Sequence, residues 1–308
     1  MNIASNFIKQ IAQNNGFALC GIAKAEPLPI EQHRFEVALS YDYHAKKEYL
    51  EREIEKRFNP KLLLENCKSV VVCGFNYNAV RGERCEISGK RCEVKGERCE
   101  VSQYAKIKDY HIFMKEKLEA VAQNLKEKYG DFNYKTTIDS SGISEKAWAV
   151  RAGIGYYGKN GIIQTSVGSF VFLGLLLMDI EVDEYDTPNL KTCGNCSKCM
   201  IECPTQAIVK PYYVDCNRCI TFLNTNKNED DFFKVAKYGW WYACDICQNV
   251  CPNNTNAPIN EEAVLMQKLN TDNFEDILKN LTPESFEQHF KETVLYKFGY
   301  EGLKKRIR

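Results

Sequence analysis

Short apolar runs alternate with amphipathic stretches along the first 180 residues of the chain. The apolar runs are β-branched or alternate with polar positions, which predicts strands; they lie at 17–25, 69–77, 132–139 and 168–180. The amphipathic stretches predict helices; they lie at 4–14 (capped by Ser5), 108–130 (closed by Gly130) and 145–153, with more helix over 260–308. The stretch 31–56 is charged and periodic and contains the helix-like AKKEYLEREIEKR. We expect an α/β sandwich followed by a different kind of module.

Two cysteine motifs follow this region and share one spacing. They read Cys193-x2-Cys196-x2-Cys199-x3-Cys203-Pro204 and, incompletely, Cys244-x2-Cys247-x3-Cys251-Pro252. Bacterial ferredoxins use this spacing, in which three cysteines hold one 4Fe–4S cluster and the fourth ligates the other. Two clusters need eight thiolates, and the motifs supply seven because Trp241 stands where the missing cysteine is expected.

The eighth ligand is expected in the segment between the motifs, where Cys216 and Cys219 are the nearest candidates and Cys219 is preferred. One predicted cluster takes Cys193, Cys196, Cys199 and Cys251, and the other takes Cys203, Cys219, Cys244 and Cys247. Zinc needs only four ligands and does not explain a repeated rhythm that ends in proline. Disulfides do not suit a chain without an export signal.

The overall composition narrows the class further. The 308 residues are 44% hydrophobic and carry no net charge, so nucleic acid has to be met by a local basic patch. The longest apolar run, Phe170 to Met178, is about half a membrane span. With no export pattern and 15 cysteines that point to metal, we expect a cytoplasmic protein without a membrane anchor.

A heptapeptide repeats three times over residues 82–102 and places Cys85, Cys92 and Cys99 in matching settings. It fits either a metal-binding or redox tract or a tandem duplication in a surface loop, and the loop is favoured because loop length costs little stability. An acidic linker at 181–189 marks a boundary before the cysteine module. The predicted domains are 1–185, 186–256 and a helical C-terminal segment, 257–308.

Several separate stretches together resemble the epoxyqueuosine reductase family, over about residues 15–305. The resemblance rests on their order and spacing, since each stretch alone is weak. They are Tyr104-Ala105, Asp109-Tyr110-His111, Asp139 with Glu145, Arg151 to Gly155, Gly158-Lys159-Asn160, Gly168-Ser169, both cysteine motifs and Cys219-Ile220-Thr221.

This resemblance implies an α+β fold: a nitroreductase-like sandwich that binds cobalamin, a two-cluster ferredoxin module and a short helical C-terminus. It implies reduction of epoxyqueuosine to queuosine in the anticodon stem-loop of tRNA, with electrons from an external low-potential donor passing through both clusters, and a monomer. It also favours Cys219 as the eighth ligand. Asp139 matches the family's proton donor, which suits the chemistry if a dry pocket raises its pKa.

The resemblance also implies corrin contacts at Ser102, Asp139, Ile163, Thr221 and Asp245. His111 is not named as a cobalt ligand, because a lone histidine beside an apolar helix is more often packed or hydrogen-bonded. The alternative for Asp139 is an N-cap for the helix that starts near Ser144.

Two departures from the family pattern bear on function. Asp139 is followed by Ser140-Ser141 where relatives commonly have Gly-Pro, and the chain stops before their C-terminal helical repeats. The tRNA is then expected on a local basic surface; the candidates are Lys198, Lys210, Arg218, Lys227, Lys234, Lys237, Lys304, Lys305, Arg306 and Arg308. The alternatives are a corrinoid reductive dehalogenase and a plain ferredoxin-type electron carrier.

Overall fold

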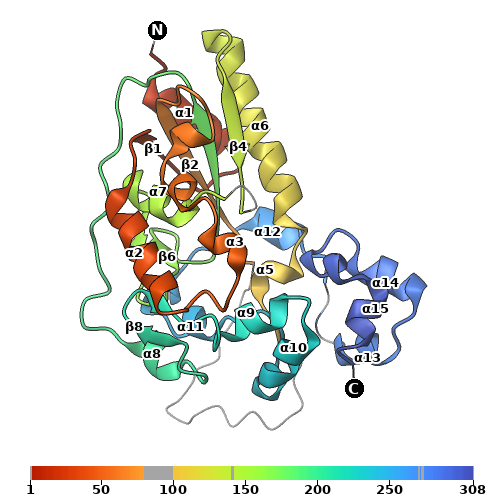
Figure 1. Ribbon diagram of the computed structural model, residues 1–308. Coiled ribbons are helices and arrows are strands. Elements are labelled where there is room, and N and C mark those ends of the chain that lie inside the picture. Colours follow the sequence, from red (N-terminus) through yellow and green to blue (C-terminus); the bar gives the residue numbers. More distant parts are fainter. Residues whose placement is uncertain (1, 80–99, 140–141, 270, 272–273, 308) are drawn as a thin grey trace.

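A four-stranded antiparallel sheet forms the centre of the computed structural model (Figure 1). The structure describes residues 2–79, 100–139, 142–269, 271 and 274–307. The strand order is β1 (Leu19–Lys24), β2 (Ser69–Asn76), β7 (Val171–Met178) and β4 (Tyr134–Thr137). All four predicted strands are confirmed, although β4 ends two residues before Asp139.

Helices cover both faces of the sheet, because the central strands carry apolar side chains on both faces. On one face Cys73 packs in a core with α1 (Ser5–Asn14) and α6 (Tyr110–Tyr129). On the other face its neighbour Val72 packs with α7 (Glu145–Arg151). The alternation along β2 therefore builds the two cores of the predicted sandwich.

The predicted cap of the first helix is wrong. Ser5 lies inside α1, and the N-cap position belongs to Ala4, which offers no side-chain hydrogen bond. The Asp183 carboxylate accepts from the Ser5 backbone amide at 2.8 Å instead. A residue 178 positions away along the chain thus satisfies a helix end that local sequence was expected to satisfy.

The charged, periodic stretch 31–56 forms three separate helices, and the break between the second and third interrupts the segment AKKEYLEREIEKR. These are α2 (Pro29–Ser40), α3 (Glu48–Glu51) and α4 (Ile54–Phe58). The chain turns between them through residues with left-handed φ, among them Asp42 and Glu53. Such residues end a right-handed helix. The turns direct Tyr43 toward Tyr213 of the cysteine module.

The cysteine module consists of short elements joined by turns. They are α8 (Lys198–Glu202), β8 (Ile208–Lys210), β9 (Tyr213–Val214), α9 (Ile220–Thr225), α10 (Glu229–Val235), η2 (Ala236–Tyr238), β10 (Trp240–Tyr242), α11 (Ile246–Asn249) and η3 (Pro252–Asn254). The antiparallel pair β5 (Gly155–Tyr157) and β6 (Ile163–Thr165) comes before the module, directly after α7. β10 pairs in parallel with β3 (Glu100–Val101), just before α5 (Gln103–Lys106). This pairing joins the module to the sandwich.

The C-terminal segment packs as a small helical layer beside β10 (Figure 1). The layer is made of α13 (Phe274–Lys279), α14 (Pro283–Phe290), η4 (Val294–Phe298) and α15 (Gly299–Lys304). The preceding helix, α12 (Glu261–Leu265), lies apart from this layer, because its buried Ala263 packs in the core formed by α1 and α6. Trp241, which replaces the expected cysteine, is buried in this layer against Phe232 and Phe274. Trp241, at the position where the spacing predicts a cluster ligand, is thus part of a third hydrophobic core.

Two predictions stay open after the fold is described. The cysteines of the heptapeptide repeat, Cys85, Cys92 and Cys99, lie outside the described residues. The domain boundaries at 185 and 256 also stay predictions. Within the described ranges, no helix is both long and apolar enough to cross a bilayer.

Candidate iron–sulfur and catalytic site

The first group of cysteines gathers around Cys251. Burial, followed by the charges of Cys251, Cys193 and Cys196, raises the pKa of the Cys199 thiol to about 11. Burial also raises the pKa of Cys251, with the charges of Cys193 and Cys196 adding to it. The four cysteines assigned to one predicted cluster are therefore electrostatic neighbours.

The second group gathers around Cys244 and Cys247. Burial raises the pKa of Cys244, and the charges of Cys247 and Cys219 contribute. The pKa of Cys219 is raised by burial and by the charge of Cys203. Cys216 has a pKa of about 12, raised by burial and then by Cys219. Cys219 thus lies between Cys216 and the second group.

The donor set suits iron–sulfur ligation better than any single ion. Across the described residues, all eight thiols are free, and no three Cys, His, Asp or Glu side chains are arranged to hold one ion. Thiolates are the ligands of iron–sulfur clusters, and positive iron opposes the mutual repulsion that raises their pKa values. The assignment of individual ligands stays a prediction.

Three of the predicted corrin contacts meet beside the second group. The Ser102 hydroxyl donates to Asp245 Oδ1 at 2.6 Å, and the Gln103 amide donates to Asp245 Oδ2 at 2.7 Å. The Thr221 hydroxyl donates to the Cys244 carbonyl at 3.3 Å. Burial raises the pKa of Asp245, which is 3% exposed. The N-cap residues of α5 and α11 and a residue of α9 therefore converge next to the cluster cysteines.

Ile163 lies in a different setting from these three. It is buried in β6 and packs in the core beneath α7. The loop before it reaches the module, because Asn160 donates to the Cys247 carbonyl at 3.5 Å. The structure therefore places Ile163 in a core and gives no contact between it and Asp245.

Asp139 lies two residues beyond β4 in the left-handed region, with φ of +46°. This conformation is costly for a non-glycine residue and is often retained at functional sites. Its Oδ2 accepts from the Tyr110 hydroxyl at 2.9 Å and lies 3.3 Å from His111 Nε2. The N-cap of α7 is Ser144. The helix-cap alternative for Asp139 is therefore wrong.

The charge state of Asp139 differs from the expectation. The hydrogen bond from His111 lowers the pKa of Asp139, with the Tyr110 hydroxyl adding to the effect. His111 Nδ1 lies 2.7 Å from Asp109 Oδ1, and its pKa is raised to about 9 by Asp109 and then Asp139. At neutral pH the carboxylates are ionised and His111 carries the proton.

Glu145 supplies a second protonated group beside Asp139. Burial, together with the charge of Asp139, raises its pKa to about 7. Glu145 is one of the residues on which the family resemblance rests, but that resemblance assigns it no role. The sequence feature that could have indicated a role is the position of Glu145 in the first turn of the helix that follows Asp139.

Two buried oxygen atoms lie close to these residues without a partner among the residues that the structure describes. They are Gln103 Oε1 and Glu145 Oε1. Buried polar atoms normally have hydrogen-bond partners, so each of these unpaired oxygens fits a contact with a polar ligand. Gln103 is adjacent to the Ser102–Asp245 contact, and Glu145 is adjacent to Asp139.

Part of the predicted basic surface is wrong. Arg306 is 4% exposed and donates to the backbone carbonyls of Asn224 and Asn226, so it is a structural residue. Lys305 pairs with Glu229, and Arg308 lies outside the described residues. Of the described residues in this run, Arg306 is therefore not available to RNA, and Lys305 is engaged in an ion pair.

Comparisons with known proteins define the class first. The model of a 4Fe-4S double cluster binding domain matches residues 192–254, which contain all eight predicted ligands. The fold and the paired cysteine groups define a double-cluster iron–sulfur protein. The model of epoxyqueuosine reductase QueG, DUF1730, matches residues 57–140.

Curated relatives then define the family. Epoxyqueuosine reductase of Cyclobacterium marinum is 35% identical over 98% of this chain and 95% of its own length. The Bacillus subtilis relative is 37% identical over 66% of this chain and 52% of its own length. The chain belongs to the epoxyqueuosine reductase family. The predicted family is confirmed, and neither alternative is favoured.

Solved structures support the same fold. A crystal structure of epoxyqueuosine reductase with an epoxyqueuosine-modified tRNA-Tyr stem loop matches with a TM-score of 0.82 and 28% identity, over 98% of this chain and 79% of that chain. The Bacillus subtilis enzyme, with its aspartate catalytic loop swung out of the active site, matches at 0.81 and 28%, over 98% and 79%. The predicted α+β fold is confirmed.

Proposed function

We propose that this protein reduces epoxyqueuosine to queuosine in the anticodon stem-loop of tRNA. The observation that carries the proposal is the convergence of a double-cluster module and an acid network in a chain of this family. The balanced reaction takes two electrons and two protons, expels the epoxide oxygen as water and leaves an alkene. A tRNA substrate places the reaction in the cytoplasm, and the monomeric state stays a prediction.

Cobalamin is the proposed second cofactor, and the described residues fit it. Ser102, Asp245, Thr221 and the unpaired Gln103 oxygen form a polar, largely buried cradle beside the second cysteine group. When bound there, reduced cobalamin supplies a low-potential metal centre for removing the epoxide oxygen. An external donor supplies the electrons through the two cysteine groups.

The proton comes from a network rather than from Asp139 alone. Asp139 is ionised in this conformation, while His111 and Glu145 hold protons near neutral pH. A proton on His111 Nε2 faces Asp139 Oδ2 across 3.3 Å. Asp139 is 65% exposed at its side chain, so it is positioned to pass a proton to substrate and to be recharged by His111.

An aromatic and basic surface is the proposed contact for the stem-loop. Tyr41 stacks on Tyr43 with ring centroids 5.4 Å apart, and Lys210 lies 4.9 Å above the Tyr41 ring and 4.3 Å above Tyr213. Tyr41 and Tyr49 are each 58% exposed. Single-stranded RNA binds by stacking on aromatic side chains beside cations.

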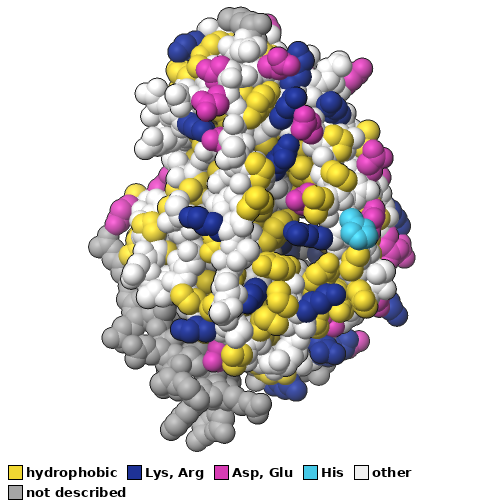
Figure 2. All heavy atoms as spheres, turned by 90° about the vertical axis from the view of Figure 1, so that its left-hand side faces the viewer, with side chains coloured by type: hydrophobic (Ala, Val, Ile, Leu, Met, Phe, Trp, Pro, Cys, Tyr) yellow, Lys and Arg dark blue, Asp and Glu magenta, His cyan; other side chains and the backbone are white. Residues whose placement is uncertain are grey.

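This surface lies near the acid network, because Tyr49 is close to Asp139. Asp139 is close enough to raise the pKa of Tyr49 after burial does. The face that carries α2 and β8 shows lysine and arginine side chains scattered among hydrophobic ones (Figure 2). Of the predicted basic residues, Lys210 is the one whose setting in the structure best supports RNA binding.

Asp139→Asn tests the acid network within this function. The amide keeps an acceptor for Tyr110 and His111 but cannot carry a proton to the leaving oxygen. We expect turnover of a modified stem-loop to fall by about 10²-fold or more, with iron and cobalamin content unchanged. Full turnover by the variant contradicts the proton-donor role. Failure of the wild-type protein to bind cobalamin contradicts the proposed cofactor.

A further inference from the structure

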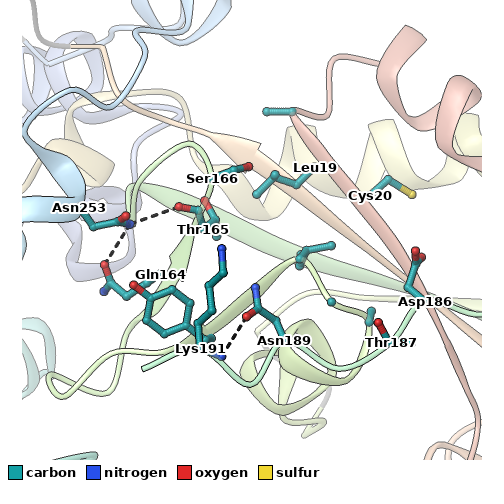
Figure 3. Close-up of a pocket in the computed structure, with 15 residues that line it drawn as sticks. Leu19, Cys20, Gln164, Thr165, Ser166, Asp186, Thr187, Asn189, Lys191 and Asn253 are labelled. Atoms are coloured by element: carbon teal, nitrogen blue, oxygen red, sulfur yellow. Dashed lines mark hydrogen bonds between the residues drawn. The ribbon is translucent and has the colours of Figure 1, made fainter. Parts of the chain in front are cut away.

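A cavity of about 640 Å³ is lined by residues that include Leu19, Gln164, Lys191 and Asn253 (Figure 3). It opens between the start of edge strand β1, the turn from α7 to β5, the end of β6 and the linker at 186–191. None of the proposed corrin contacts lines it. The mechanism proposed above leaves this cavity unused.

Sheet register places the cavity at the opposite edge from Asp139. Leu19 of β1, which lines the cavity, pairs with Gly74 of β2, and Gly74 pairs with Leu173 of β7. Asp139 follows β4 at the same end of the sheet, beyond Thr137 and its partner Leu175. Three strand spacings separate the edges, or about 14 Å.

Two residues that line the cavity lead directly to the first cysteine group. The Cys251 thiol donates to Gln164 Oε1 at 3.4 Å. Tyr156 has its pKa raised by burial and then by the charges of Cys193 and Cys251. A ligand in the cavity therefore lies one side chain away from a predicted cluster.

The second cysteine group lies at the other end of this path. Thr221 contacts the Cys244 carbonyl, and Asp245 follows Cys244 in the chain beside Ser102. The order through the molecule is therefore cavity, first group, second group, corrin contacts. Electrons that enter by the cavity reach both clusters before the reacting centre.

The chemistry of the walls suits a flat, polar redox group. Asn253 donates to Gln164 Oε1 at 3.3 Å and to the Thr165 carbonyl at 3.2 Å, so an amide and a carbonyl edge the cavity. Figure 3 shows the Lys191 side chain extending toward Thr165. Tyr156 adds an aromatic ring. Amides match the hydrogen-bonding edge of an isoalloxazine ring, and a lysine matches a phosphate.

We propose that this cavity receives the isoalloxazine ring of a reduced flavin, which is the external electron donor. The inference rests on the proposed function and names the donor class for it. One electron leaves the flavin and reduces a cluster held by Cys251 and its partners, so the flavin is oxidised by one electron. Two such transfers supply the two electrons of the epoxide reduction.

Stopped-flow reduction of the iron-loaded protein by photoreduced flavin mononucleotide tests this, with cluster bleaching as the readout. The variants are Ser166→Trp, which fills the cavity, and Lys191→Glu, which reverses its cation. The matched control is Lys115→Glu on the exposed face of α6. In a separate measurement, the fluorescence of oxidised flavin mononucleotide reports its binding to each variant.

We expect the clusters of both cavity variants to bleach at least about tenfold more slowly with reduced flavin. We also expect both variants to bind flavin about tenfold more weakly, which corresponds to about 1.4 kcal/mol of binding free energy. The control and the rate with dithionite stay unchanged. A parallel experiment uses a reduced flavodoxin-type protein as the donor. If the cavity variants bleach more slowly with this protein but not with free flavin, the ring that enters the cavity belongs to a protein-bound flavin.

Equal rates for wild type and both cavity variants in both arms overturn the inference. Stem-loop turnover driven by dithionite separates this failure from that of the proposed function, since dithionite bypasses the cavity. Turnover with dithionite but no variant-sensitive flavin step rejects the cavity alone.

Discussion

Replacing Asp109 with asparagine isolates the electrostatic part of the acid network. Asp109 is the N-cap of α6 and accepts from the His111 backbone amide at 3.0 Å. Asparagine caps helices as well as aspartate, so the helix start is retained. The substitution replaces the ionised carboxylate, whose hydrogen bond contributes most to raising the pKa of His111 to about 9, with a neutral amide.

The magnitude follows from that pKa. A rise from 6.5 to about 9 corresponds to on the order of 3 kcal/mol between the two protonation states. Because 41% of the His111 side chain is exposed, solvent screening reduces the contribution to stability to about 1 kcal/mol. The pKa is raised in the folded state, so this stabilisation is complete below pH 6.5 and is lost as pH rises through about 9.

Hydrogen–deuterium exchange at the imidazole carbon, read residue by residue by mass spectrometry, gives the pKa of His111 directly. In Asp109→Asn it should fall toward 6.5, and the variant should lose about 1 kcal/mol of unfolding free energy at pH 6 but little at pH 10. Activity should decline at a correspondingly lower alkaline pH. An unchanged His111 pKa in the variant refutes the network.

Three further predictions follow from the cluster, core and RNA contacts. Cys219→Ser should lose about half of the bound iron and Cys216→Ser none, measured by iron assay; equal loss contradicts the choice of ligand. Trp241→Ala should destabilise the fold by about 3–5 kcal/mol in denaturant titration, and a neutral effect rejects its core role. Tyr41→Ala should weaken stem-loop binding by about 1–3 kcal/mol without changing cobalamin binding; unchanged RNA affinity rejects the stacking surface.

Periodicity and spacing predict the strands and the grouping of cysteines because these depend on local order along the chain. The apolar run of β7 is buried between two layers, so pattern alone identifies it. The breaks within the stretch 31–56 escape this reasoning, since its turns depend on left-handed residues such as Asp42 that no propensity marks. The cap at Ser5 fails because the acceptor, Asp183, is remote in sequence.

The candidate site shows the same division. Asp139 follows from the family motif, but its lowered pKa depends on His111, which approaches only when α6 packs beside β4. The Ser102–Asp245 contact spans 143 positions and exists because β3 pairs with β10. Spacing within a motif is local information, whereas protonation states are set by neighbours that the fold brings together.

The central claim is tested most directly by one turnover measurement. Iron-loaded, chemically reduced protein is mixed with an epoxyqueuosine-containing anticodon stem-loop, with and without cobalamin, and the nucleosides are analysed by mass spectrometry. We predict conversion to queuosine, with loss of one oxygen, only when cobalamin is present. Unchanged epoxyqueuosine in the complete mixture, from protein shown to hold both clusters and cobalamin, contradicts the proposed function.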